Sequence, residues 1–159
     1  MADNRRRTRA CIVCALAAFV LVVSHAVHIQ AQAAPLPAVT TVWSGVYTDA
    51  QAERGSVVYL RTCSKCHGSD LLGNEAVEYP ALVGDDFMHQ WEGSPLSRLV
   101  DRIRTGMPFD RPGTLSPHES VDLVAYLLRT NRVPEGASEL PPDRDALQRV
   151  VLTRSETGQ

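Results

Sequence analysis

The run Cys63-Ser64-Lys65-Cys66-His67 constrains the fold of this chain more than any other part of the sequence. It places two thiols one backbone turn apart, with an imidazole directly after the second thiol. These are the only cysteines after residue 33, and His67 is one of three histidines in that part of the chain. The rest of the chain is expected to form short helices and long loops. Such a fold buries too little apolar surface to be stable unless a disulfide, a metal or a cofactor stabilises it.

A Cys-x-x-Cys-His run is the attachment sequence of c-type haem. The two thiols add to the porphyrin vinyl groups as thioethers, and the adjacent imidazole binds the iron. Three other uses compete. Cys-x-x-Cys pairs are usually redox-active rather than structural disulfides, a thioredoxin-like site requires a βαβ context, and zinc requires two further ligands. We therefore predict one covalent haem c, held by Cys63, Cys66 and His67.

The second axial ligand of the iron is expected to be Met107. It follows a predicted helix stop in the sequence Thr105-Gly106-Met107-Pro108, where irregular backbone can turn a side chain towards the iron. Met88, His89 and His118 are the alternatives. Met88 is also expected to pack in the core, and His118 is expected to be exposed.

Hydrophobic periodicity and capping patterns predict an all-α fold, with three to five short helices and long loops around the haem. We expect helices over residues 49–62 and 85–92, then one that begins at Pro95 with Ser94 as its N-cap and stops at Gly106. A capping box starts the helix over residues 117–130, and at most a short helix follows within residues 143–152. No segment alternates as a strand does.

The first 33 residues are typical of a secretory signal peptide. Residues 1–9 are basic, residues 10–23 are apolar, and Ala31-Gln32-Ala33 supplies a cleavage pattern, with Ala26 as a second choice. Cys11 and Cys14 lie inside the apolar run and are interpreted as small hydrophobic residues of the signal. We expect a periplasmic protein, attached to the membrane only if this segment is retained as an anchor. The other predicted parts are an N-terminal arm or linker (34–47), a domain (48–133) and a Pro-rich tail (134–159).

The net charge of the chain is slightly negative, which argues against nucleic-acid binding. By itself it does not identify another partner. The whole chain has 16 basic and 18 acidic residues, and without residues 1–33 it has 12 and 17, near −5. Lys65 is the only lysine.

From about residue 46 to residue 133, the chain resembles a class I c-type cytochrome. The matching elements are Gly55 and Tyr59 before the Cys-x-x-Cys-His run, Pro80 and Met107 after it, and Tyr126 in the last long helix. The resemblance implies that the first and last helices cross at Gly55. It also implies that the carbonyl of Pro80 accepts a hydrogen bond from the proximal histidine and fixes its tautomer.

Within that class the chain is most similar to small periplasmic cytochromes found with, or fused to, quinoprotein dehydrogenases. The resemblance implies a non-enzymatic single-electron carrier. It would take electrons from a dehydrogenase, for which a quinoprotein is one candidate, and pass them to an oxidase or another cytochrome. The alternatives are a haem enzyme or gas sensor with an open sixth coordination position, and an electron-transfer subunit of a dehydrogenase complex.

The scarcity of lysine points away from the lysine-rich docking face of mitochondrial cytochromes c, and an arginine patch or apolar rim is expected instead. The haem edge near Cys63 and Cys66 is expected to serve as the electron port. The residues expected to surround the haem are apolar: Leu82, Phe87, Trp91, Leu99, Ile103 and Leu127.

Overall fold

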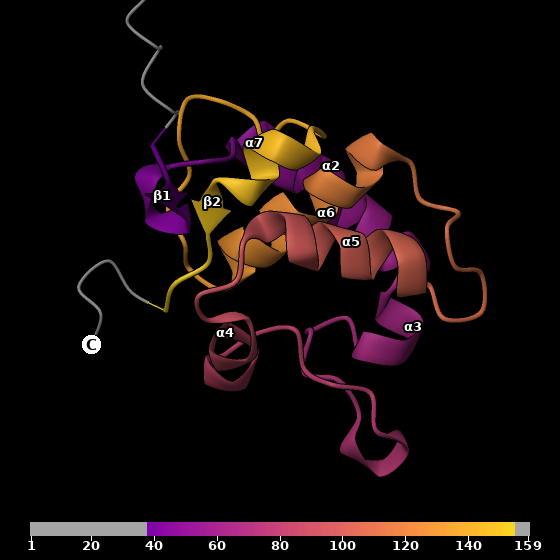
Figure 1. The fold of residues 1–159 in the computed structure, drawn as a ribbon. Coiled ribbons are helices and arrows are strands. Elements are labelled where there is room, and N and C mark those ends of the chain that lie inside the picture. The colour runs from indigo at the N-terminus through magenta and orange to yellow at the C-terminus, as the bar shows by residue number, and fades with distance from the viewer. Residues whose placement is uncertain (1–37, 155–159) are drawn as a thin grey trace, which may run out of the picture. The chain divides into compact units, whose positions relative to one another are not determined.

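The computed structural model describes residues 38–154, which belong to one compact unit spanning Leu36–Gln159. The predicted signal peptide lies outside the described residues. Figure 1 shows a mostly helical fold, as predicted. The helices of the described part are α2 (Asp49–Thr62), α3 (Ser64–His67), α4 (Asp85–Trp91), α5 (Leu96–Gly106), α6 (Pro117–Thr130) and α7 (Arg144–Gln148). Two 3₁₀ turns, η1 (Val42–Ser44) and η2 (Glu75–Val77), and two short strands, β1 (Thr40–Thr41) and β2 (Val150–Val151), complete it.

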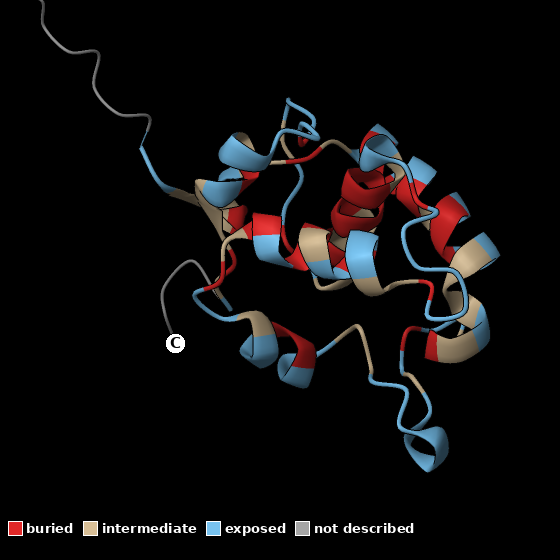
Figure 2. Cartoon of the chain, turned by 45° about the vertical axis from the view of Figure 1, so that its right-hand side comes forward, coloured by how far each residue is buried: buried red, intermediate tan, exposed pale blue. Residues whose placement is uncertain are grey.

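The two longest helices, α2 and α6, pack against each other at a glycine. A Cβ atom on Gly55 would overlap the backbone carbonyl of Asp122 on α6, so the two backbones approach as closely as they do because this residue has no side chain. Beside the crossing, the rings of Tyr59 and Tyr126 lie 5.3 Å apart, centroid to centroid. Most of α6 is buried, as Figure 2 shows. The helix crossing implied by the resemblance is therefore present.

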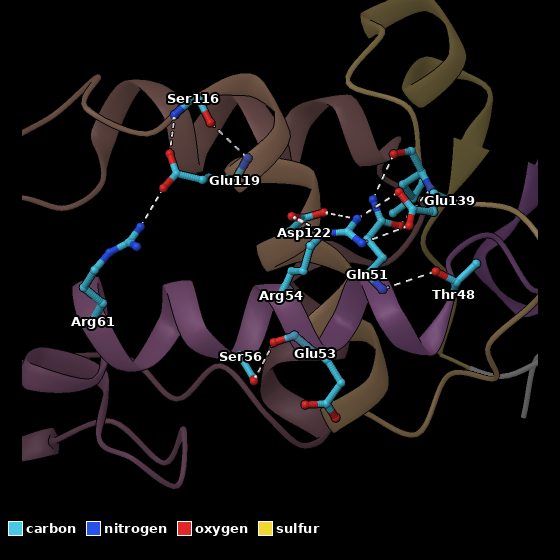
Figure 3. Close-up of polar contacts among 11 residues, drawn as sticks. Thr48, Gln51, Glu53, Arg54, Ser56, Arg61, Ser116, Glu119, Asp122 and Glu139 are labelled. Carbon is cyan, nitrogen blue, oxygen red and sulfur yellow. Dashed lines mark hydrogen bonds and ion pairs between the residues drawn. The ribbon is translucent and has the colours of Figure 1, made fainter.

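Ion pairs along one side of this crossing connect α2 to α6 and to the C-terminal segment (Figure 3). Arg54 contacts Asp122 at 3.0 Å and Glu139 at 2.8 Å. Arg61, near the end of α2, contacts Glu119 at 2.6 Å. Glu119 also accepts a hydrogen bond from the backbone N–H of Ser116, which completes the predicted capping box of α6.

The predicted start of α5 was wrong by one residue. Pro95, rather than Ser94, occupies the N-cap position. Ser94 is buried, and its carbonyl accepts a hydrogen bond from the backbone N–H of Leu152 at 2.9 Å. The contact comes from 58 residues further along the chain, so the local sequence around Pro95 holds no sign of it.

The two ends of the described chain lie side by side and form a short pair of strands. The sequence predicts no strand, because no segment has an alternating pattern. Thr40 and Thr41 pair in parallel with Val150 and Val151. The indole N–H of Trp43 donates to the carbonyl of Thr153 at 2.9 Å. This pairing draws the N-terminal arm onto the domain.

The segment predicted as a Pro-rich tail packs against the helices as far as the structure describes it. Leu140, Leu147 and Leu152 are almost completely buried. Arg144 on α7 pairs with Asp101 on α5 at 2.8 Å. These three leucines are therefore part of the hydrophobic core, while the residues between them are mostly exposed. No helix within the described residues is both long and apolar enough to span a membrane.

Candidate functional site

A cavity of about 610 Å³ lies among the helices, lined by residues of α2 to α6 and of two loops. Its volume falls within the range of roughly 300–1,000 Å³ typical of ligand and cofactor pockets. Its apolar lining includes every residue predicted to surround a haem, namely Leu82, Phe87, Trp91, Leu99, Ile103 and Leu127. The predicted cofactor residues Cys63, Cys66, His67, Pro80 and Met107 line the same cavity.

The imidazole of His67 is held by a hydrogen bond to the backbone of a distant loop. Its Nδ1 lies 2.9 Å from the carbonyl oxygen of Pro80, and because a carbonyl only accepts, Nδ1–H is the donor. Nε2 of the neutral ring is then unprotonated and has its lone pair available for a metal. His67 is buried on the single turn α3, whose place directly after α2 puts the ring at the cavity wall.

The two cysteines lie at and within the same helical turn. Cys63 stands between α2 and α3, Cys66 lies within α3, and the carbonyl of Cys63 accepts hydrogen bonds from the N–H groups of Cys66 and His67, at 3.1 and 3.0 Å. This compact turn brings both thiols to one cavity. The two sulfurs are not joined in a disulfide. Burial raises the pKa of the Cys63 thiol, although its contact with the Thr62 hydroxyl acts in the opposite direction.

Met107 reaches the cavity from α5. The helix ends at Gly106, and Met107 continues in extended backbone while its N–H still bonds to the carbonyl of Ile103 at 3.0 Å. The three alternative ligands do not line the cavity. Met88 is buried on α4, whereas His89 and His118 are exposed.

The polar and aromatic rim of the cavity contains residues that the sequence did not single out. Tyr79 and Gln90 line it, and Phe109 lies at it with 85% of its surface exposed. Four basic and two acidic residues line the same cavity: Arg61, Lys65, Arg102, Arg111, Glu78 and Asp110. These charges are spread over five segments, so no local pattern assembles them.

The donor set and the cavity fit a haem. Two thiols at the cavity wall can form thioethers, an oriented imidazole and a thioether sulfur can bind iron, and the apolar lining suits a flat macrocycle. The described residues contain no cluster of three or more His, Cys, Asp or Glu side chains of the kind that holds a bare metal ion.

Comparison with known proteins agrees with this chemistry. Residues 50–127 match the family described as "Cytochrome C oxidase, cbb3-type, subunit III". A thiosulfate dehydrogenase from Psychrobacter arcticus is 30% identical over 87 residues, which cover 50% of this chain and 26% of that protein. The chain thus spans about a quarter of the length of this relative.

The crystal structure of the sulfane dehydrogenase SoxCD from Paracoccus pantotrophus contains a chain with a TM-score of 0.49 and 22% identity. The match covers 72% of this chain and 64% of that one. On the strength of the family match, the helical fold and the Cys-x-x-Cys-His site, residues 50–127 form a cytochrome c family domain.

Proposed function

We propose that this protein carries single electrons by means of one covalently bound haem c, with His67 and Met107 as the axial ligands. The observation that supports this most directly is that one cavity gathers Cys63, Cys66, His67 and Met107, while the alternative ligands lie elsewhere. With both axial positions filled by side chains, no position is left for a substrate. This favours electron transfer over a haem enzyme or gas sensor.

When bound, the haem supplies a one-electron couple between ferrous and ferric iron. The chain's own residues set the conditions of that couple. Pro80 holds the His67 ring in one orientation and keeps Nδ1 protonated. The soft thioether sulfur of Met107 favours the ferrous state, and the apolar lining excludes water and acts in the same direction.

Export and redox partners extend the proposal. The N-terminal signal pattern supports a periplasmic location, either free or attached by an uncleaved signal segment. The similarity to a thiosulfate dehydrogenase supports a dehydrogenase as electron donor, either as a separate protein or as a complex in which this chain is the electron-transfer subunit. A quinoprotein remains a candidate for that donor, and the acceptor would be an oxidase or another cytochrome.

The identity of the sixth ligand can be tested with two matched substitutions. Met107→Leu should remove the charge-transfer absorption band of iron–methionine ligation from the oxidised holoprotein and lower its reduction potential. Met88→Leu conserves side-chain volume in the same way but lies outside the cavity, so the band should persist. Loss of the band only in Met88→Leu would contradict the assignment. Stoichiometric carbon monoxide binding by the reduced wild type would instead support an open site.

A further inference from the structure

The loop between α3 and α4 carries an exposed surface that extends beyond the lining of the cofactor site. Residues 74–79 form a closed turn, in which Asn74 and Tyr79 exchange two backbone hydrogen bonds of 2.8 and 3.0 Å around η2. The turn projects from the helices in Figure 1, and Figure 2 shows that it is exposed. We call the surface formed by Leu72, Glu75, Val77, Glu78 and Tyr79 the loop face.

Three large apolar side chains are exposed on the loop face. The exposed fractions are 63% for Leu72, 53% for Val77 and 41% for Tyr79. Single exposed apolar residues are ordinary, but three within eight residues of one projecting loop are typical of a protein interaction site. Gly73 allows this loop to close, since it has a φ of +72° and a Cβ there would overlap the Tyr79 carbonyl.

The loop face borders a second cavity of about 360 Å³. Glu75, Glu78 and Asp86 line this cavity, and none of the described residues that line it is a lysine or an arginine. The rim of the haem cavity, by contrast, has more basic than acidic residues. Within the described chain, the second cavity is therefore lined by acidic groups without basic ones, and Glu78 lines both cavities.

The wall between the two cavities leads directly to the proposed iron ligand. Tyr79 and Pro80 line both cavities. The ring of Tyr79 lies 6.4 Å from that of His67, centroid to centroid, and the carbonyl of Pro80 holds Nδ1 of His67. A protein seated on the loop face would thus be separated from the iron ligand by a single layer of residues.

We propose that the loop face is the docking site of a one-electron redox protein whose contact surface is apolar at its centre and basic at its edge. The proposal rests on the electron-transfer function and adds an electron port on the His67 side to the one expected near the cysteines. One electron passes between the docked partner and the iron, so one protein is oxidised and the other reduced, with no bond made or broken. Acidic and apolar groups together suit a short-lived redox contact, in which charge steers the encounter.

An electrode can stand in for the partner. The probe is gold coated with a mixed layer of amine-terminated and methyl-terminated alkanethiols, which is basic and apolar. Cyclic voltammetry of the holoprotein on this layer gives both the amount adsorbed and the interfacial electron-transfer rate. Val77→Ser/Tyr79→Ser should lower the rate about tenfold, as expected for loss of a central aromatic contact. Glu75→Gln/Glu78→Gln should reduce adsorption and weaken its dependence on salt.

Matched variants on other surfaces control for general effects. Val57→Ser/Leu60→Ser removes two apolar residues of similar exposure from α2, and Glu135→Gln/Asp145→Asn removes two exposed acids from the C-terminal segment. Both should behave as the wild type. Leu72→Ser and Val77→Ser, made singly, test the face without altering the contact between Tyr79 and His67.

Several results would overturn the proposal. It fails if the loop-face variants match the controls, or if the wild type reacts faster on a carboxylate and methyl layer, which would place docking at the basic rim. A concentration-dependent dimer dissolved by Val77→Ser would assign the face to a second copy. If the wild type binds lipid vesicles and Val77→Ser does not, the loop face would instead be a membrane-binding surface. Absence of a reversible one-electron wave from the wild type on uncharged graphite would instead refute the electron-transfer function itself.

Discussion

At the scale of single residues, one hydrogen bond prepares His67 for metal binding, and one close backbone contact requires glycine at position 55. The carbonyl of Pro80 determines which nitrogen of His67 is free for a metal. The resemblance implied this bond, and the structure contains it. The packing of α2 against α6 likewise depends on a single residue, because Gly55 has no side chain to keep the two backbones apart.

We expect Gly55→Ala to lower the free energy of unfolding of the holoprotein by about 3 kcal/mol, since the new methyl group would meet the backbone of α6, which cannot move aside cheaply. Urea unfolding followed by circular dichroism measures this. Gly106→Ala is the control. Its methyl group would meet only the flexible end of the Arg102 side chain, so the change should stay below about 1 kcal/mol. Equal effects in the two variants would argue against the close approach as the cause.

At the scale of secondary-structure elements, the helix starts carry the clearest sequence signals. Ser116 caps α6, as the capping-box pattern predicts, and Thr48 caps α2 in a similar way, because capping involves residues within one turn. The start of α5 and the strands β1 and β2 depend on contacts between segments far apart in the chain. Local patterns contain no information about such contacts.

The capping box of α6 should make stability depend on pH. The backbone N–H of Ser116 donates to Glu119 and, with the Ser116 hydroxyl and Arg61, lowers the pKa of this carboxyl below the ordinary value of a glutamate. A lowered pKa in the folded state adds stability that is present above the pKa of the unfolded chain and lost as the pH falls through the folded value. We expect Glu119→Gln to reduce the loss of unfolding free energy between about pH 5 and pH 3.

Urea titrations at several pH values measure this effect. Glu135→Gln, at an exposed position outside the capping box, should retain the pH dependence of the wild type. The assignment is wrong if both variants flatten the profile to the same degree.

The C-terminal segment should contribute to stability as a core element does. Leu152 is 1% exposed, so we expect Leu152→Ala to lower the free energy of unfolding by about 2–5 kcal/mol. Leu60→Ala, on the exposed face of α2, should change it by less than about 0.5 kcal/mol. Thermal and urea unfolding of the two holoproteins provide the comparison. A small effect at Leu152 would show that residues 134–154 contribute little to the fold.

At the scale of the whole molecule, the fold surrounds a central cavity of about 610 Å³. The helices contact one another mainly at the α2–α6 crossing. The wall of the cavity on the other side is formed by α4 and by the loop after α3. The Cys-x-x-Cys-His run and six apolar residues predicted the site that this cavity brings together, and the family resemblance implied the helix crossing. The sequence did not predict the loop face, because the exposure of Leu72, Val77 and Tyr79 depends on how the loop projects.

We expect Cys63→Ala/Cys66→Ala to give a largely unfolded protein, because the haem that these thiols attach would fill the centre of the core. Far-ultraviolet circular dichroism and the cooperativity of thermal unfolding measure this. Cys11→Ala/Cys14→Ala is the matched control and should leave the mature protein folded and coloured. A cooperatively folded, helical protein without Cys63 and Cys66 would mean that the polypeptide alone supplies enough core.

The contacts just after α4 have a consequence for how the wall of the cavity is held. The N–H of Gly93 bonds to the carbonyl of Leu152, and Glu92 pairs with Arg154, so the end of α4 is tied to the segment that contains β2. These partners lie about sixty residues after α4 in the chain. Any displacement of α4 from the cavity must therefore either break these contacts or move the segment that pairs with Thr40 and Thr41.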